Sequence, residues 1–163
     1  MNSDLFEDNI IKNYNADSIK ITLVVSEFNA KIIENLLEGA ISAYKHYGGN
    51  EKKCTIYRVP GAFEIPGIIN QILKYQKPDA IIAIGAIIKG DTPHFDYVAS
   101  ESARGLGEIS RKSNIPIINA IITTNNIDQA KARSIIGGAN KGWDALESAL
   151  QTIQEYKNIA TKS

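Results

Sequence analysis

The chain has 163 residues, of which 44% are hydrophobic, and its 18 basic and 18 acidic residues leave no net charge when histidine is neutral. A chain of this size and composition predicts one domain, spanning residues 1–163, with a core large enough to fold alone. The balanced charge and the lack of a basic run argue against nucleic acid or a membrane surface as the main partner.

Residues 1–18 are polar and contain no apolar segment of signal-peptide length, so we expect no targeting sequence here. No later apolar run reaches membrane-spanning length without interruption. The segment has no helical face and lacks proline, which predicts an extended arm able to add a strand to a neighbouring sheet edge.

A first strand is predicted over residues 19–25, and an amphipathic helix follows it after a short link. Asn29 is a suitable N-cap for this helix, which ends at Gly48. Phe28 follows the carboxyl end of the strand, where it either packs onto the helix as a hydrophobic staple or serves as a ligand platform. The buried stripe of the helix is predicted to contain Ile32, Ile33, Leu36, Leu37, Ala40, Ile41 and Tyr44.

A second strand is predicted over residues 54–59, and its Cys54 is the single cysteine, which excludes an intrachain disulfide. Because His and Cys also form no cluster with metal-ligand spacing, we expect a metal-free site and a cytoplasmic location. Two prolines and a glycine then fix an uncommon loop over residues 59–66. This loop presents Glu64 at the carboxyl edge of the sheet, although a favourable charge in the next helix's first turn also explains that residue.

Residues 79–98 are the most informative stretch of the sequence for the fold and the site. From Ala80 to Ile88 every residue is apolar or glycine, which predicts a strand buried on both faces, as in parallel sheets. A turn and a helix follow, so the free N–H groups at the helix start face the carboxyl edge of the sheet and suit an anion. His94 lies in the first helical turn, where the dipole favours a neutral, proton-accepting ring. An ordinary helix start, with Asp91 or Thr92 as the N-cap, also explains the turn.

A fourth strand is predicted over residues 116–122, then a short helix around residues 129–133 and a last helix that begins after Asn140. Four strands alternating with helices, joined by right-handed crossovers, predict a parallel sheet in the order 2-1-3-4. The expected fold class is therefore α/β, a three-layer α/β/α sandwich with a flavodoxin-like four-stranded sheet and the extended N-terminal arm.

Six separated motifs together resemble a known family. They are Ser-Glu-Phe-Asn at 26–29, Val-Pro-Gly-Ala-Phe-Glu-Ile-Pro at 59–66, Gly-Ala-Ile-Ile-Lys-Gly-Asp-Thr-Pro-His-Phe at 85–95, Ile-Thr-Thr at 122–124, Gln-Ala-Lys-Ala-Arg at 129–133 and Asn-Lys-Gly at 140–142. In order and spacing they resemble lumazine synthase along nearly the whole chain after the first strand begins. The resemblance implies a transferase that catalyses the penultimate step of riboflavin biosynthesis. Its two small-molecule substrates would be 5-amino-6-(D-ribitylamino)uracil and 3,4-dihydroxy-2-butanone 4-phosphate, condensed to 6,7-dimethyl-8-ribityllumazine with release of phosphate and water.

The resemblance also implies roles for the matching residues. His94 would move protons as the catalytic residue, while Asp91 and Thr92 would take the phosphate together with Arg133, whose planar fork suits it. No metal or cofactor is implied. The residues implied to bind the pyrimidine substrate, by stacking on the ring, holding the ribityl chain or lining the ring pocket, are Phe28, Ala62, Phe63, Glu64, Ile87 and Ile88.

The family builds each site between neighbouring subunits of a ring, so the resemblance implies that Asn119, Arg133 and Lys141 reach the site from the adjacent chain. We therefore expect a homopentamer, with twelve pentamers in an icosahedral shell as the larger alternative and riboflavin synthase as a candidate partner. Two positions depart from the family pattern, because Asn119 stands where many members have an aromatic residue and Glu27 where many have a basic one. The first departure puts the role of the Asn119 side chain in doubt.

Three other kinds of function are compatible with a sheet of this type and differ in the residues they require. An FMN-binding electron carrier would need a Ser-, Thr- or Gly-rich phosphate loop after the first strand, where the chain has Glu27 and Phe28. A response-regulator receiver would need an acidic cluster and a phosphorylatable aspartate at the ends of the first and third strands, which are absent. A related pentameric protein that makes riboflavin from two lumazines, or a noncatalytic cage, would keep the fold and change the task.

Overall fold

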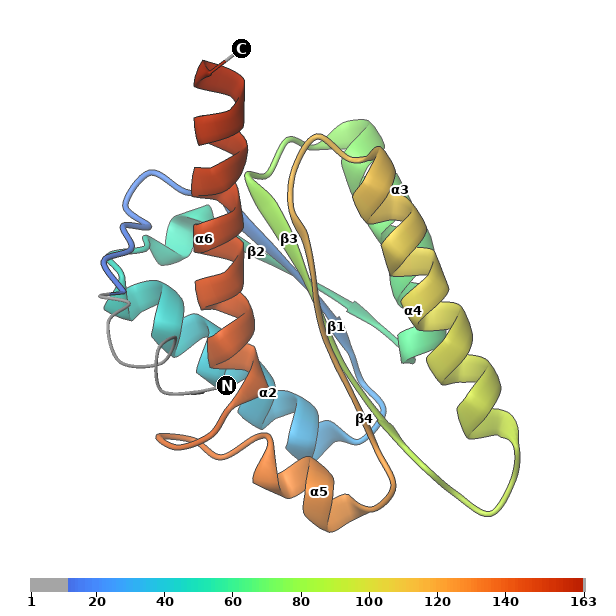
Figure 1. The fold of residues 1–163 in the computed structure, drawn as a ribbon. Helices are drawn as coiled ribbons and strands as arrows, with labels where there is room; N and C mark the ends of the chain where they lie inside the picture. The colour runs from blue at the N-terminus through green and yellow to red at the C-terminus, as the bar shows by residue number, and fades with distance from the viewer. Residues whose placement is uncertain (1–11, 163) are drawn as a thin grey trace, which may run out of the picture.

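The computed structural model describes residues 12–162. Helices and strands alternate along the chain, as Figure 1 shows. In order they are β1 (Ile21–Ser26), α2 (Ala30–His46), the 3-10 turn η1 (Glu51–Lys53), β2 (Cys54–Val59), the 3-10 turn η2 (Ala62–Glu64), α3 (Ile65–Tyr75), β3 (Ala80–Ile88), α4 (His94–Lys112), β4 (Ile117–Thr124), α5 (Ile127–Ala132) and α6 (Lys141–Thr161).

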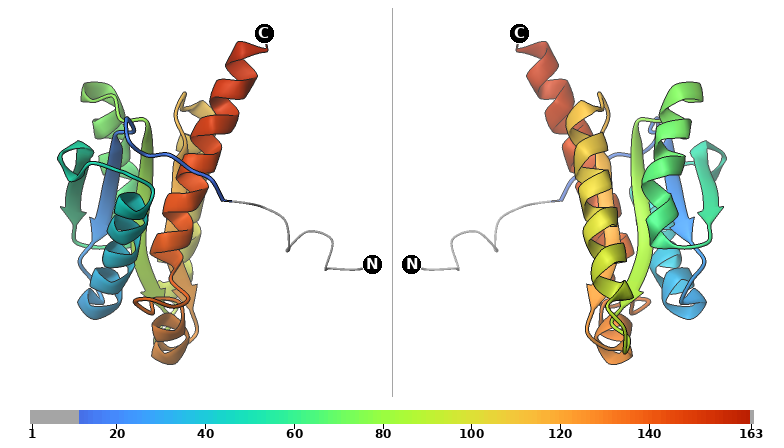
Figure 2. Two further views of the ribbon diagram at one scale, coloured as in Figure 1. Left: turned by 90° about the vertical axis from the view of Figure 1, so that its left-hand side faces the viewer. Right: turned by 90° about the vertical axis from the view of Figure 1, so that its right-hand side faces the viewer.

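The four strands form one parallel sheet in the order β2-β1-β3-β4, which confirms the predicted topology. Helices α2 and α6 cover one face of the sheet and α3 and α4 cover the other (Figures 1 and 2), giving the three predicted layers. Neighbouring residues of a strand alternate between the two cores: Leu23 and Val25 pack under α2 and α6, whereas Val24 packs under α3 and α4. Within the described residues, no helix is long and apolar enough to cross a membrane.

The central strand β3 has the predicted bounds and pairs with β1 on one side and β4 on the other. Its apolar run is buried on both faces except at Ile88, which is partly exposed. Strand β2 also has its predicted bounds, whereas β1 begins at Ile21 rather than residue 19 and β4 continues two residues further, to Thr124. The extension of β4 follows from its partner, because Thr124 pairs in register with Ile88.

The N-cap of α2 lies at Asn29 as predicted, but the expected capping hydrogen bond is missing there, and the alternative of an Asp91 or Thr92 cap on α4 is wrong. Asn29 occupies the N-cap position of α2, but its backbone is left-handed, with φ 65°, and its side chain makes no capping hydrogen bond. Helix α4 has Pro93 at its N-cap, so neither Asp91 nor Thr92 caps it, and again no side-chain hydrogen bond closes the helix start. The Asn29 amide is engaged elsewhere, since its Nδ2 donates to the carbonyl oxygen of Ala86 at 3.1 Å.

Helices α2 and α6 cross at close range because glycine lies at the crossing. A Cβ atom on Gly142 would lie 1.8 Å from the carbonyl oxygen of Leu36, so this position tolerates no side chain as built. Beside it the buried Asn140 accepts from the N–H of Gly142 at 2.8 Å and donates to the carbonyl oxygen of Asn35 at 2.9 Å. These bonds cap α6 and tie its first turn to α2, which fixes the position of Lys141.

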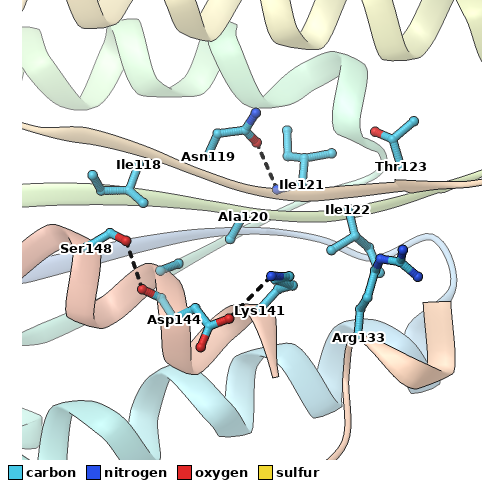
Figure 3. A pocket seen from close by; sticks show the side chains of 11 residues that line it. Ile118, Asn119, Ala120, Ile121, Ile122, Thr123, Arg133, Lys141, Asp144 and Ser148 are labelled. Atoms are coloured by element: carbon cyan, nitrogen blue, oxygen red, sulfur yellow. Dashed lines mark hydrogen bonds and ion pairs between the residues drawn. The ribbon is translucent and has the colours of Figure 1, made fainter. Parts of the chain in front are cut away.

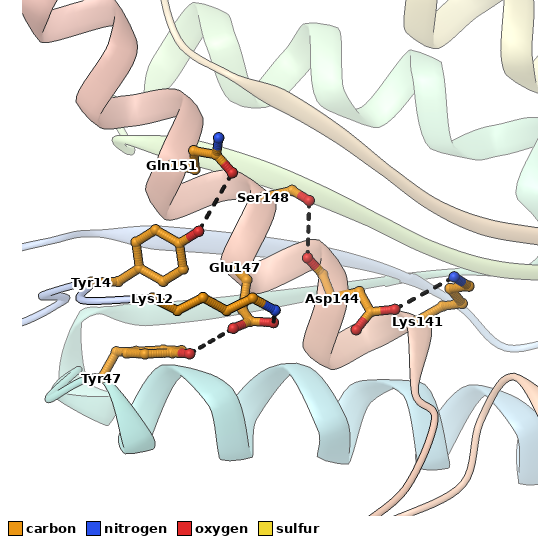
Figure 4. Close-up of polar contacts among 8 residues, drawn as sticks. All are labelled: Lys12, Tyr14, Tyr47, Lys141, Asp144, Glu147, Ser148 and Gln151. Carbon is orange, nitrogen blue, oxygen red and sulfur yellow. Dashed lines mark hydrogen bonds and ion pairs between the residues drawn. The ribbon is translucent and has the colours of Figure 1, made fainter. Parts of the chain in front are cut away.

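The predicted arm at residues 1–18 falls partly outside the described residues, which begin at Lys12. From there the chain lies against α2 and α6 of the same molecule (Figure 4). The buried carboxylate of Glu147 accepts from Lys12 Nζ at 3.0 Å and from the Tyr47 hydroxyl at 2.6 Å, and the rings of Tyr14 and Tyr47 meet edge to face. A buried carboxylate needs such partners, so this end of the arm is fixed to the domain.

Candidate active site

A cavity of about 630 Å³ opens at the carboxyl edge of the sheet. The ends of β1 and β3, the loop that contains η2 and the first turns of α4 all contribute to its wall, as expected for an open α/β sheet. Most of the predicted site residues line it, namely Phe28, Ala62, Phe63, Glu64, Ile87, Ile88, Thr92 and His94.

Exposed aromatic side chains gather at this cavity. Phe28 and Tyr97 are each 72% exposed and Phe63 is 57% exposed, and all three line the cavity. The exposure of Phe28 excludes the interpretation of this residue as a buried staple on α2. Exposed aromatic rings beside apolar Ile87 and Ile88 suit a flat, partly apolar ligand.

The η2 loop is held by the Glu64 carboxylate. Glu64 Oε2 accepts from the N–H of Gly61 at 3.0 Å, and the Glu64 N–H donates to the Gly61 carbonyl oxygen at 3.2 Å. The carboxylate therefore shapes the loop, and because an ionised carboxylate accepts at both oxygens, it also retains capacity for a hydroxyl-rich ligand. Both interpretations of Glu64, as a loop residue and as a ligand contact, are compatible with this geometry.

The first turn of α4 offers a place for an anion. His94 is the first residue of this 19-residue helix, as predicted, and its side chain lines the cavity together with Thr92. No side chain caps the helix, although the N–H of Asp96 donates to the carbonyl oxygen of Pro93 at 3.1 Å, and the helix dipole favours negative charge at this end. Asp91 lies in the same turn but is exposed and does not line the cavity.

Three of the predicted site residues lie elsewhere, at a second cavity of about 380 Å³ along β4 and the start of α6 (Figure 3). Asn119, Arg133 and Lys141 line this cavity, and none of its lining residues also lines the first. The structure thus divides the predicted site residues of one chain between two separate surfaces.

The polar groups of the second cavity are partly engaged within the chain. Asn119 Oδ1 accepts from the N–H of Ile121 at 2.9 Å, and an Arg133 guanidinium N–H donates to the carbonyl oxygen of Gln129 at 2.9 Å. Lys141 Nζ lies 3.5 Å from Asp144 Oδ2 in an exposed ion pair. Figure 3 shows Asn119 on one side of β4 and Arg133 and Lys141 on the other, so a ligand contacting all three would wrap the edge of the strand.

Sequence reasoning missed three residues that the cavities include. Tyr97 belongs to none of the motifs, although its spacing of three residues from His94 on one helix places it on the same face. Asn29 was read as a helix cap and instead lines the first cavity with Ala86. Asp144 lines the second cavity beside Lys141, again at a spacing of three residues. Among the described residues, no group of three or more His, Cys, Asp or Glu side chains could hold a metal ion.

Comparison with known proteins gives a consistent result. Residues 18–157 match a family model described as 6,7-dimethyl-8-ribityllumazine synthase. A protein of that name from Chlorobium luteolum is 42% identical over 144 residues, which cover 88% of this chain and 93% of the relative. Another of the same name, from Campylobacter hominis, is 43% identical over 140 residues, which cover 86% and 90%.

Proposed function

The chain belongs to the 6,7-dimethyl-8-ribityllumazine synthase family, and from that premise we propose that it builds its active site from the two cavities of neighbouring subunits. It is a transferase of riboflavin biosynthesis that makes 6,7-dimethyl-8-ribityllumazine. The substrates are 5-amino-6-(D-ribitylamino)uracil and 3,4-dihydroxy-2-butanone 4-phosphate, and phosphate and water are released.

In the first cavity we assign the pyrimidine substrate to the apolar and aromatic wall. Phe28 stacks on the ring, Ile87 and Ile88 line the ring pocket, and the loop at Ala62, Phe63 and Glu64 holds the ribityl chain. Three exposed aromatic rings around one cavity support this assignment, because such rings bind flat heterocycles by stacking.

The phosphate of the second substrate is assigned to the start of α4. Asp91 and Thr92 offer backbone N–H groups and one hydroxyl there, and the uncapped helix favours an anion. His94 lies in the same turn, within reach of a substrate bound between the phosphate and ring positions, and moves protons. An exposed Asp91 is compatible with this role, since its carboxylate remains in water while its backbone binds.

The observation that carries the shared site is the separation of the two cavities. Arg133 suits the phosphate, yet it lines the cavity along β4 with Asn119 and Lys141, and no residue is common to both cavities. A second copy of the chain can supply these three side chains, with each subunit giving one cavity to each neighbour. This exchange is the heterologous contact that generates closed rings. We propose a pentamer, with an icosahedral shell and a riboflavin synthase partner as extensions of it, in the cytoplasm.

The chemistry fits a site with few charged groups. The amino group of the pyrimidine is unprotonated near neutral pH, so its attack on the ketone needs no strong base. Alignment of the two substrates supplies most of the rate enhancement, and His94 contributes proton transfer during imine formation, phosphate loss and ring closure. The family's reaction requires no cofactor, and none is assigned.

Mixed rings of two variants test the shared site. His94→Ala and Arg133→Ala subunits, each poorly active alone, are unfolded together in equal amounts and refolded. If one site takes His94 and Arg133 from different chains, random mixing restores about one site in four. Activity near a quarter of wild type supports the proposal. Activity no higher than the average of the two pure variants, with mixed rings verified by mass, would refute it.

A further inference from the structure

The link between β1 and α2 contains an unusual backbone conformation at Asn29. Among the described residues it is the only one other than glycine with a positive φ, at 65°. Most non-glycine residues avoid this conformation, and asparagine tolerates it better than most. Asn29 is the last residue of the three-residue link from the end of β1 at Ser26 to the start of α2 at Ala30.

The backbone before Asn29 is already fixed on one side. The N–H groups of Glu27 and Phe28 donate to the carbonyl oxygens of Val59 and Pro60, at 2.9 and 3.2 Å, and so extend the contact of β1 with the β2 side. These two bonds hold Phe28 against the loop that leads to η2. They make no contact with β3, which forms the opposite wall of the cavity.

The Asn29 side chain connects the end of β1 to β3. The register between β1 and β3 ends at the pair of Val25 and Ile84, and Ala86 lies two residues beyond it. The amide of Asn29 donates to the Ala86 carbonyl oxygen at 3.1 Å and therefore links the two walls where strand pairing has ended. Asn29 and Ala86 both line the first cavity, next to Phe28 and Ile87 respectively.

We infer that Asn29 is a positioning residue, which sets the distance and angle between the Phe28 ring and the Ile87–Ile88 wall so that a flat pyrimidine fits between them. The inference rests on the proposed function for the identity of the ligand. Phe28 is 72% exposed, so packing does little to orient its ring, and the adjacent backbone must do so. Without the amide link, the left-handed turn at Asn29 becomes a hinge beneath the stacking ring.

Two variants separate the amide from the backbone conformation. Asn29→Gly keeps a positive φ without strain and removes the side chain. Asn29→Asp keeps a residue that tolerates this conformation, but its carboxylate cannot donate to the Ala86 carbonyl oxygen. Asn50→Gly is the matched control, because Asn50 also starts an element, its side chain accepts a hydrogen bond from the N–H of Lys52 at 3.0 Å, and it lines neither cavity.

The readout is the dissociation constant of 5-amino-6-(D-ribitylamino)uracil, measured by calorimetry, together with the Michaelis constant of each substrate. We expect Asn29→Gly and Asn29→Asp to weaken pyrimidine binding about tenfold, and Asn50→Gly to leave it unchanged. The Michaelis constant of the phosphate substrate should stay within about twofold of wild type in all three. Equal rises in the Michaelis constants of both substrates would indicate general loosening of the site and would overturn the inference. A wild-type affinity for the pyrimidine in Asn29→Asp would also overturn it.

A double-mutant cycle with Phe28→Ala tests whether Asn29 acts through the ring. Once Phe28 is removed, Asn29→Gly should cost little further affinity, so the two effects should be far from additive. Additive losses would overturn the inference. A wild-type protein that binds the pyrimidine but does not turn over would instead contradict the proposed function alone, because the affinity measurements do not depend on turnover. If Asn29→Gly fails to assemble, Asn29→Asp decides the question.

Discussion

Gly142→Ala is expected to destabilise the protein strongly, because Gly142 lies where α6 crosses α2. The new Cβ atom would lie 1.8 Å from the carbonyl oxygen of Leu36, whereas ordinary contact begins at 3.4 Å. The helices would therefore have to separate locally by about 1.6 Å, the difference between these two distances, against a backbone atom that cannot rotate away. Overpacking of this severity lowers the free energy of unfolding by about 3 kcal/mol.

The control is the same substitution at Gly67, in α3, where a Cβ atom would meet nothing within 4 Å. Gly67→Ala should raise stability by about 0.5–1 kcal/mol, since alanine is the better helix former. In a chain of this size the two variants should differ by about 10 °C in melting temperature. Thermal unfolding at one fixed protein concentration measures this, because the proposed assembly would make the midpoint concentration-dependent. A Gly142→Ala midpoint at or above that of wild type would refute the steric reasoning.

Three further predictions concern buried polar groups. Ser26→Ala should raise the free energy of unfolding by about 1 kcal/mol, because the buried Ser26 hydroxyl has no hydrogen-bond partner within residues 12–162. A lower free energy of unfolding in denaturant melts would contradict this. Burial raises the pKa of Tyr44 to about 12, so the stability it contributes is complete below about pH 10 and is lost as the pH rises through 12. Tyr44→Phe should flatten that loss in alkaline melts, and an unchanged pH profile would exclude Tyr44 as its source. Glu147→Gln removes the charge that holds Lys12 at 3.0 Å, so tryptic cleavage at Lys12 should become faster, and an unchanged rate would show that the ion pair does not fix the arm.

Sequence predicts well those elements whose residue pattern depends only on their own segment of the chain. β3 is recognisable because an unbroken run of apolar residues and glycine from Ala80 to Ile88 is typical of a strand buried on both faces. The gathering of Phe28, Glu64 and His94 at one cavity is also predictable, because parallel strands bring their carboxyl ends to one edge.

The capping of α2 was not predictable, since the Asn29 amide has two possible partners and the choice depends on where the sheet places Ala86. A capping side chain would accept a helix N–H at Oδ1, whereas the orientation found here lets Nδ2 donate to a carbonyl oxygen 57 residues away, and only the strand order brings that oxygen within reach. In the same way, no local signal brings Arg133 and Lys141 to one cavity with Asn119. That grouping follows from the crossing of α6 over α2, which Gly142 and the buried Asn140 permit.

The placement of the two cavities on separate surfaces ties the number of complete active sites to the number of contacts between subunits. If the site is shared as proposed, an isolated subunit has no working site, however well it folds. An open row of subunits has one complete site fewer than it has subunits, because each end exposes one unmatched cavity. In a closed ring every cavity is matched, so the numbers of sites and subunits are equal. Dilution below the dissociation constant of the ring would therefore abolish activity while every subunit kept its fold. Turnover per subunit would then measure the fraction of subunits that are in closed rings.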